Sequence, residues 1–487
     1  MSKRAASSDP SVEAAKKPKA TDTSSKSSDY KKSESARSWR RPACPTLTPK
    51  HSPLAFQIVD IDMFDGKPLP SNPATDPATG LAKERPGMTQ ANCTVSFLLW
   101  SSFFFYLHDI LITFENVSFV TIFLFSLLLL LLFRQVPILR IFGITEAGNS
   151  CVTHVHGFTP YFICDAPPGF DPTKLEAFRS SLNNSVKENA RGASQYGSFF
   201  VLHVEVLHKR SLVGFVPGNA TAMFLKIFVS MPKLIPTARR VLENGFYFGG
   251  SSHQHLTYES NVPFVLRFMV DHDITGCCWV ELPAGTYSLR GDGTGGTIRK
   301  QTRMQLEADI YHNELVAHES EGQWMKIAPL RILSFDIECQ GRKGHFPEAD
   351  KDPVIQIASI VSVQGEDKPR LKAIHVLGTC TDIVGAEVYT HDDERLLLTN
   401  WAKFLVESDF DVITGYNIQN FDLPYVFNRA KTLNVFGKVS DISRVNGRMA
   451  TMKEATFSSS AFGTRKVSFL LTLSFFWVFF VFCMYYF

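Results

Sequence analysis

The sequence predicts a mixed α/β fold in which a β-rich N-terminal domain precedes a second domain of alternating strands and helices. Its length of 487 residues allows two to four domains, and its composition, 45% hydrophobic and 20% charged, suits a globular protein. Apolar runs of β type dominate from residue 54 to about residue 330. From residue 331 such runs alternate with helical segments, which is typical of layered α/β domains.

Residues 1–50 form a basic tail. They contain 12 Lys and Arg against five Asp and Glu, and almost no large apolar residue, so we expect this segment to be disordered. Two basic groups within it resemble a bipartite nuclear import signal, which predicts a nuclear protein. A solvated basic tail is the alternative. The residues of the two groups are Lys3, Arg4, Lys16, Lys17 and Lys19.

We predict one β-rich N-terminal domain from residues 51–94 together with 136–330. The stretch 225–245 reads as a strand followed by a helix. His154 and His156 alternate along one strand and could be a ligand pair, but without a third ligand nearby an ordinary strand face is the better interpretation. The predicted strands cover 54–62, 136–143, 151–158 and 199–206.

The second domain is predicted over residues 331–466. A helix expected around 392–407 has acidic residues in its first turn, where the helix dipole favours them. The other predicted elements are strands at 331–338, 354–361 and 411–416 and a helix at 422–433.

Two very apolar blocks, residues 95–135 and 467–487, interrupt or end these domains. The first contains 18 consecutive uncharged residues and the second 21, so each passes by length for a transmembrane helix. However, the first block separates two strands of one predicted domain, and both blocks open with Val-Ser-Phe, which can be encoded as a splice donor. We therefore favour two translated introns. In that case Thr94 joins Val136, and a cDNA across this junction tests the hypothesis.

The nine cysteines include no Cys-x-x-Cys pair and no zinc-type spacing with histidine. This pattern argues against a structural zinc and against a disulfide framework. The N-terminus also has no apolar segment of the kind found in a secretory signal.

Asp336 and Glu338 are the most informative residues of the chain. They lie two apart in an apolar run that reads as a buried strand, so their carboxylates point to the same face. Two buried carboxylates side by side need a cation to neutralise them. Asp422, at the start of a predicted helix, supplies a third carboxylate. The three predict a site for two Mg²⁺ or Mn²⁺ ions that hydrolyses phosphodiesters.

The segment before Asp422 contains candidates for binding a nucleic acid strand. Tyr416 and Phe421 can stack on bases, and the Asn417 amide can hydrogen-bond a sugar or phosphate. We therefore predict that a single strand enters the site along these residues.

Phe335-Asp336-Ile337-Glu338 and Tyr416-Asn417-Ile418-Gln419-Asn420-Phe421-Asp422 resemble the first and second motifs of the 3′–5′ proofreading exonuclease of family B DNA polymerases. The resemblance covers about 54–94 and 136–465 and is strongest to eukaryotic replicative members. It implies a ribonuclease-H-like exonuclease domain with Asp336, Glu338 and Asp422 as metal ligands. It also implies a single-stranded 3′ end and primer–template DNA as substrates, and accessory subunits and a sliding clamp as partners of the full-length protein. If the two apolar blocks are introns, we expect no membrane contact.

The chain departs from that family in what it does not contain. The third exonuclease motif, Tyr-x-x-x-Asp with the fourth carboxylate, has no counterpart in residues 423–487. The polymerase motifs are missing too, and the iron–sulfur or zinc sites of the family fall outside this chain. We therefore expect a fragment that does not polymerise DNA. The alternatives are a stand-alone nuclease with the same carboxylates and a membrane-anchored protein without enzymatic activity.

Overall fold

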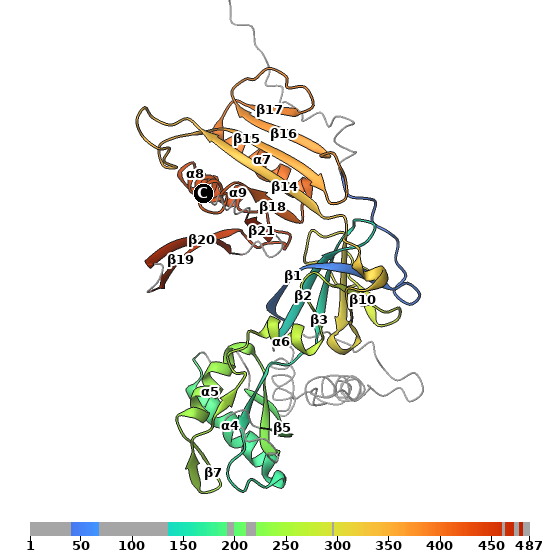
Figure 1. Cartoon of the computed structure of the whole chain (residues 1–487), viewed down its shortest axis with the longest axis vertical. Helices are drawn as coiled ribbons and strands as arrows, with labels where there is room; N and C mark the ends of the chain where they lie inside the picture. Colours follow the sequence, from blue (N-terminus) through green and yellow to red (C-terminus); the bar gives the residue numbers. More distant parts are fainter. Residues whose placement is uncertain are drawn as a thin grey trace, which may run out of the picture. The chain divides into compact units, whose positions relative to one another are not determined.

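The computed structural model contains three main β-sheets, each with its own arrangement of strands (Figure 1). The predicted import signal and nearly all of the first apolar block, residues 95–134, lie outside the described residues. The structure describes residues 40–67, 135–191, 199–210, 221–294, 297–459, 463–471 and 477–480.

The first sheet has seven strands in the order β11-β12-β3-β2-β1-β10-β13, and β12 and β3 are its parallel pair. The predicted strands at 54–62, 136–143 and 151–158 are confirmed as β1, β2 and β3. Helix α6 (Phe264–Asp271) packs Phe268 into the core of this sheet. The strands are β1 (Leu54–Gly66), β2 (Val136–Ile144), β3 (Ser150–His156), β10 (Trp279–Leu282), β11 (Tyr287–Leu289), β12 (Leu306–Tyr311) and β13 (Val316–His318).

Strands β1 and β2 pair with each other along almost their whole length. Their antiparallel register runs from Gln57 opposite Ile144 to Gly66 opposite Val136. The segment between them therefore leaves and re-enters the sheet at the same end. This agrees with the expectation that the apolar block 95–135 interrupts a single domain; the intron hypothesis itself stays a prediction.

His154 and His156 of β3 are buried and face acidic residues of the parallel neighbour β12. His154 Nε2 lies 2.7 Å from Glu307 Oε1, and His156 Nε2 lies 2.8 Å from Asp309 Oδ1. Their strand face is thus an internal polar layer. The histidines bond to carboxylates within the fold, which fits the interpretation that they are not ligands.

The second sheet has four strands in the order β5-β6-β4-β9. Along the chain its elements follow a β-α-β-β-α-β order, the split βαβ arrangement, with Phe162, Phe178 and Leu225 in its core. The predicted strand and helix in 225–245 are confirmed as β6 and α5. The elements are β4 (Tyr161–Asp165), α4 (Leu175–Asn189), β5 (Val201–Lys209), β6 (Ala222–Val229), α5 (Ile235–Glu243) and β9 (Thr257–Tyr258), beside a hairpin of β7 (Phe246–Phe248) and β8 (Ser251–His253).

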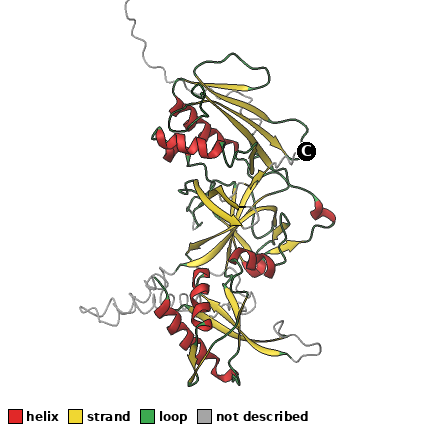
Figure 2. Cartoon of the chain, turned by 60° about the vertical axis from the view of Figure 1, so that its left-hand side comes forward, coloured by secondary structure: helices red, strands yellow, loops and turns green. Residues whose placement is uncertain are grey.

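The third sheet has six strands in the order β17-β16-β15-β14-β18-β21. Strand β15 pairs with β14 and with β16 in antiparallel fashion. Strand β18 pairs with β14, and β21 pairs with β18, both in parallel. Figure 2 shows the helices of this domain gathered on one side of its sheet. Every strand and helix predicted from residue 331 to 433 is confirmed within a few residues. The strands are β14 (Arg331–Cys339), β15 (Val354–Val363), β16 (Leu371–Leu377), β17 (Glu387–His391), β18 (Val412–Gly415) and β21 (Trp477–Phe480).

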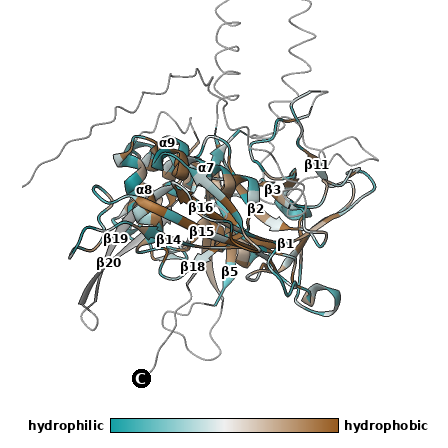
Figure 3. Ribbon diagram, turned by 90° about the horizontal axis from the view of Figure 1, so that it is seen from above, coloured by the Kyte–Doolittle hydropathy of each residue, from teal (hydrophilic) through white to brown (hydrophobic). Residues whose placement is uncertain are grey.

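Three helices accompany this sheet: α7 (Glu394–Ser408), α8 (Asp422–Thr432) and α9 (Phe436–Val439). Helix α7 begins after Asp393, whose carboxylate accepts a hydrogen bond from the Arg395 N–H and so caps the helix. In Figure 3 the central strand β15 is largely brown, hence apolar. The predicted mixed α/β fold, with a β-rich N-terminal part and alternating strands and helices from residue 331, is confirmed.

The structure describes the second apolar block, residues 467–487, only in part, and the transmembrane and intron interpretations of this block stay predictions. Residues 467–471 belong to β20 (Gly463–Leu471), which pairs with β19 (Thr451–Ser459), and β21 follows. Within the described part of the chain no helix has both the length and the hydropathy needed to cross a membrane.

Candidate active site

The two carboxylates of β14 point to one face of the third sheet, as their spacing predicts. Leu333, Phe335 and Ile337 are buried on the opposite face, whereas Asp336 and Glu338 are exposed. The expectation that this pair is buried is therefore wrong. Strand β14 is central, between β15 and β18, but only its apolar face is covered, so the carboxylates open towards solvent.

Asp422 is the buried carboxylate of the group, with 1% of its surface exposed. It is the first residue of α8, and its Oδ1 accepts a hydrogen bond of 3.2 Å from the Ile337 N–H. Ile337 lies between Asp336 and Glu338 in β14, and this bond holds the Asp422 carboxylate close enough to Asp336 for the two charges to interact. The predicted convergence from strand and helix is thus present in the structure.

Burial and the neighbouring charge of Asp336 raise the pKa of Asp422 to about 6. Two carboxylates held together in this way repel each other when both are ionised, so one of them tends to keep a proton. A bound cation would remove that repulsion. The electrostatics of the pair therefore suit a positively charged ligand.

Gly415 allows the chain to leave β18 close to β14. A β-carbon at this position would lie 2.5 Å from the Phe335 carbonyl oxygen and 2.4 Å from Ile418 Cγ2, distances that real side chains do not adopt. The following turn has Asn417 in a left-handed conformation, with φ of 55°. Its carbonyl oxygen accepts the N–H groups of Asn420 and Phe421. This turn delivers Asp422 to the start of α8.

The predicted DNA-binding residues differ in how accessible they are. Tyr416 is 78% exposed, and its ring is open for stacking. The Asn417 side-chain oxygen accepts a hydrogen bond of 2.8 Å from the Asn420 amide, so part of its capacity is used within the turn. Phe421 is half-buried, with its ring centroid 5.5 Å from that of Tyr425.

Phe346 is an exposed aromatic residue that we did not predict from the sequence. It is 73% exposed and lies in the loop after β14, with its ring centroid 5.4 Å from that of Phe421. The sequence feature that could have indicated Phe346 is an aromatic residue in a short basic segment, Gly341-Arg342-Lys343-Gly344-His345-Phe346. Phe346 and Tyr416 are thus two exposed rings in the loops that follow β14 and β18, the strands that lead to the carboxylates.

Helix α8 is anchored by a buried ion pair that we also did not predict. Arg429 donates to both carboxylate oxygens of Glu394, at 2.9 and 2.7 Å, and Glu394 Oε1 also accepts the Val354 N–H. The Tyr425 hydroxyl donates to the Asp352 carbonyl oxygen at 2.8 Å. These bonds fix α8, and with it Asp422, against α7 and β15.

Across the part of the chain that the structure describes, no three histidine, cysteine, aspartate or glutamate side chains are close enough to enclose a metal ion by themselves. The carboxylates that meet are Asp336 and Asp422, with Glu338 on the same strand face. All three offer oxygen ligands, which hard divalent cations prefer. These oxygen ligands fit such a cation, because its charge would offset the repulsion between the buried Asp422 and Asp336.

Models of known families match three parts of the chain. Residues 256–476 match "DNA polymerase family B, exonuclease domain". Residues 157–236 match "DNA polymerase delta catalytic subunit-like, N-terminal domain", and residues 128–156 match "DNA polymerase zeta catalytic subunit, N-terminal".

The chain is also similar to DNA polymerase delta catalytic subunits of several organisms. It is 39% identical to that of Mesocricetus auratus over 430 residues, which cover 88% of this chain and 33% of the relative. It is 42% identical to that of Glycine max over 332 residues, which cover 68% of this chain and 30% of the relative. The chain thus spans about a third of the length of the curated relatives it matches.

Among solved structures, the family B DNA polymerase from Pyrobaculum calidifontis matches with a TM-score of 0.42 and 24% identity. The match covers 63% of this chain and 32% of the other chain.

Proposed function

We propose that this chain carries the 3′–5′ proofreading exonuclease of a replicative polymerase of the delta type, because it belongs to the family B DNA polymerases. It spans about a third of the length of the relatives that it matches. One observation supports the proposal above all. The Ile337 N–H holds the Asp422 carboxylate beside Asp336 of the central strand, and Glu338 follows on the same face of that strand.

Asp336, Glu338 and Asp422 would hold two Mg²⁺ or Mn²⁺ ions. When bound, the ions would supply an activated water and stabilise the charge on the leaving oxygen. The chain's own contribution is to hold the three carboxylates in position. Asp336, whose charge acts on Asp422, would hold an ion together with it, and Glu338 would add a ligand from the same exposed face of β14. Burial of Asp422 excludes water from the inner side of the site.

The substrate would be the unpaired 3′ end of a DNA strand. The exposed rings of Tyr416 and Phe346 offer surfaces on which successive bases stack, without preference for sequence. The Phe421 ring packs edge to face against the Phe346 ring. The Asn417 amide nitrogen can donate to a sugar or phosphate. A paired primer end would need to unpair before it could use these rings.

In the complete polymerase, this unit would edit primer–template DNA in the nucleus. Lys3, Arg4, Lys16, Lys17 and Lys19 would serve nuclear import. The accessory subunits and the sliding clamp would be partners of that larger protein.

The test uses the purified chain, a single-stranded oligonucleotide labelled at its 5′ end, and Mn²⁺ or Mg²⁺. We expect nucleotides to be removed from the 3′ end, and Asp336→Ala with Glu338→Ala to abolish both this activity and Mn²⁺ binding measured by calorimetry. The matched control is Asp367→Ala with Asp382→Ala, which removes two exposed carboxylates elsewhere in the same domain. A wild-type chain that neither binds Mn²⁺ nor degrades the strand, or a site variant equal to the control, would refute the proposal.

A further inference from the structure

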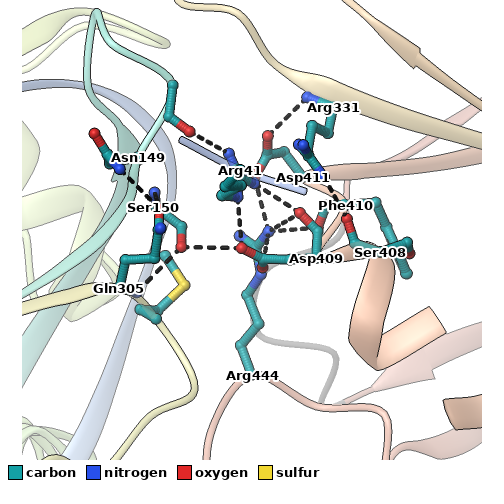
Figure 4. Close-up of polar contacts among 12 residues, drawn as sticks. Arg41, Asn149, Ser150, Gln305, Arg331, Ser408, Asp409, Phe410, Asp411 and Arg444 are labelled. Atoms are coloured by element: carbon teal, nitrogen blue, oxygen red, sulfur yellow. Dashed lines mark hydrogen bonds and ion pairs between the residues drawn. The ribbon is translucent and has the colours of Figure 1, made fainter. Parts of the chain in front are cut away.

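A buried cluster of charges lies at the base of the two strands that lead to the candidate active site (Figure 4). Arg41 contacts Asp409 through Nε and Asp411 through Nη2, each at 2.5 Å, and Arg444 Nη2 lies 2.8 Å from an oxygen of each aspartate. The side chains of Arg41, Asp411 and Arg444 are at most 5% exposed. Charges buried to this degree need partners, and here two arginines serve two aspartates.

Asp411 connects the starts of both strands. Its Oδ2 accepts the Arg331 N–H at 2.7 Å, and its own N–H donates to the Arg331 carbonyl oxygen at 2.8 Å. Arg331 is the first residue of β14, and Asp411 comes immediately before β18. The regular pairing between these strands covers only three residue pairs, from Ile332 with Val412 to Ser334 with Thr414. The Asp411 contact is therefore a substantial part of what keeps the two strands in register.

The register of these strands sets the spacing of the carboxylates. Strand β14 carries Asp336 and Glu338, whereas β18 leads through Gly415 and one turn to Asp422. A change at the base of either strand would shift Asp422 relative to the other two ligands. The buried Asp411 can hold the base in place only while its charge is balanced.

Arg41 also ties this base to the first sheet. Its Nη1 donates to the Gly148 carbonyl oxygen at 2.9 Å. The next residue, Pro42, accepts hydrogen bonds at its carbonyl oxygen from the side-chain amides of Asn149 and Gln305, at 3.2 and 2.7 Å. In Figure 4 Asn149 and Gln305 lie on one side of Arg41, and Asp409 and Asp411 lie on the other. The Arg41 side chain thus hydrogen-bonds to Gly148 beside the first sheet while it also contacts the two aspartates.

We propose that Arg41 is a positioning residue for the exonuclease site: by balancing Asp409 and Asp411 it keeps β14 and β18 in the register that brings Asp336, Glu338 and Asp422 together. The inference rests on the proposed exonuclease function. Arg41 touches neither substrate nor metal ligand, so its effect on the reaction is indirect.

The test compares Arg41→Met, Arg41→Lys and a control, Arg267→Met, in the full 487-residue chain. Arg267 is a suitable control because its side chain, 9% exposed, pairs with Glu259 and Asp271, which lie outside the cluster around Asp409 and Asp411. Residues that support metal ligands typically contribute about 10–100-fold to metal affinity or activity. We expect Arg41→Met to lower kcat about tenfold and to raise the half-saturating Mn²⁺ concentration by a similar factor, with KM for the oligonucleotide unchanged.

Hydrogen exchange provides a readout independent of activity. In Arg41→Met the amides of residues 409–416 should exchange faster, whereas the first sheet and α8 should not change. If Arg41→Met does not fold, Arg41→Lys serves instead, because it keeps the charge but loses the forked geometry. For it we expect a Mn²⁺ requirement raised about threefold.

The outcomes separate this inference from the proposed function. A chain in which Asp336→Ala with Glu338→Ala behaves as wild type would overturn the exonuclease proposal itself. If that double variant is inactive but the Arg41 variants match Arg267→Met in kcat, Mn²⁺ requirement and exchange, only the positioning role of Arg41 is overturned.

Discussion

Replacing Gly415 by alanine should damage the site without touching any candidate ligand. The added β-carbon would lie 2.5 Å from the Phe335 carbonyl oxygen and 2.4 Å from Ile418 Cγ2. Carbon contacts are comfortable at about 3.5–4.0 Å, so the turn after β18 must move by roughly 1 Å. Overpacking of this kind costs about 1–3 kcal/mol in the free energy of unfolding.

The same displacement should have a larger effect on catalysis than on stability. The bond from the Ile337 N–H to Asp422 is already 3.2 Å long, and roughly 1 Å more would break it. A misplacement of about 1 Å at a catalytic site can lower the rate by roughly a hundredfold. We therefore expect Gly415→Ala to lower kcat on single-stranded DNA by about that factor, and to lower the melting temperature by a few degrees.

Gly437→Ala is the matched control for this prediction. Gly437 lies in α9 of the same domain, and a β-carbon there meets nothing within 4 Å. Because alanine favours helix, this variant should be as stable as wild type or up to about 1 kcal/mol more stable, with unchanged activity. The assays are thermal unfolding and release of nucleotides from a labelled strand. Wild-type exonuclease rates in Gly415→Ala would refute the argument that Gly415 sets the position of Asp422.

Three further predictions concern charge, stacking and pH. Without metal, the melting temperature of Asp422→Asn should be no lower than that of the wild type, because the repulsion between Asp422 and Asp336 is removed. Mn²⁺ should raise the melting temperature of the wild type but not that of this variant. Phe346→Ala should raise KM for single-stranded DNA about tenfold with kcat unchanged, since stacking contributes about 1–3 kcal/mol per base; an unchanged KM contradicts this role. Burial alone would raise the pKa of Asp309, but hydrogen bonds from His156 and Arg290 lower it to about 2. The stability that this ionised group provides should therefore be complete above about pH 4 and lost as the pH falls towards 2, and Asp309→Asn should flatten that part of a urea-denaturation profile.

Local patterns were enough to predict most elements of the fold. Apolar runs and acidic helix starts place β1, β14, β18 and α7 within a few residues, because these signals act over short distances. The fold class followed from the change to alternating elements at residue 331. The internal polar layer of the first sheet could not be foreseen. It depends on His154 meeting Glu307 of a parallel neighbour 153 residues away in the chain.

The candidate site was predicted in outline but not in its burial. Spacing alone placed Asp336 and Glu338 on one strand face, and a strand–turn–helix pattern placed Asp422 near them. The sequence does not show which face of β14 the helices cover, so we expected the exposed pair to be buried. The contact of Arg41 with Asp409 spans 368 residues, and no local signal marks it.

The most direct test of the account is a crystal structure of the chain soaked in Mn²⁺, with the metal located by its anomalous scattering. We expect a Mn²⁺ peak between the carboxylates of Asp336 and Asp422, with Glu338 as a further ligand of this site. A well-ordered site without any peak, at a Mn²⁺ concentration that supports exonuclease activity, would contradict it.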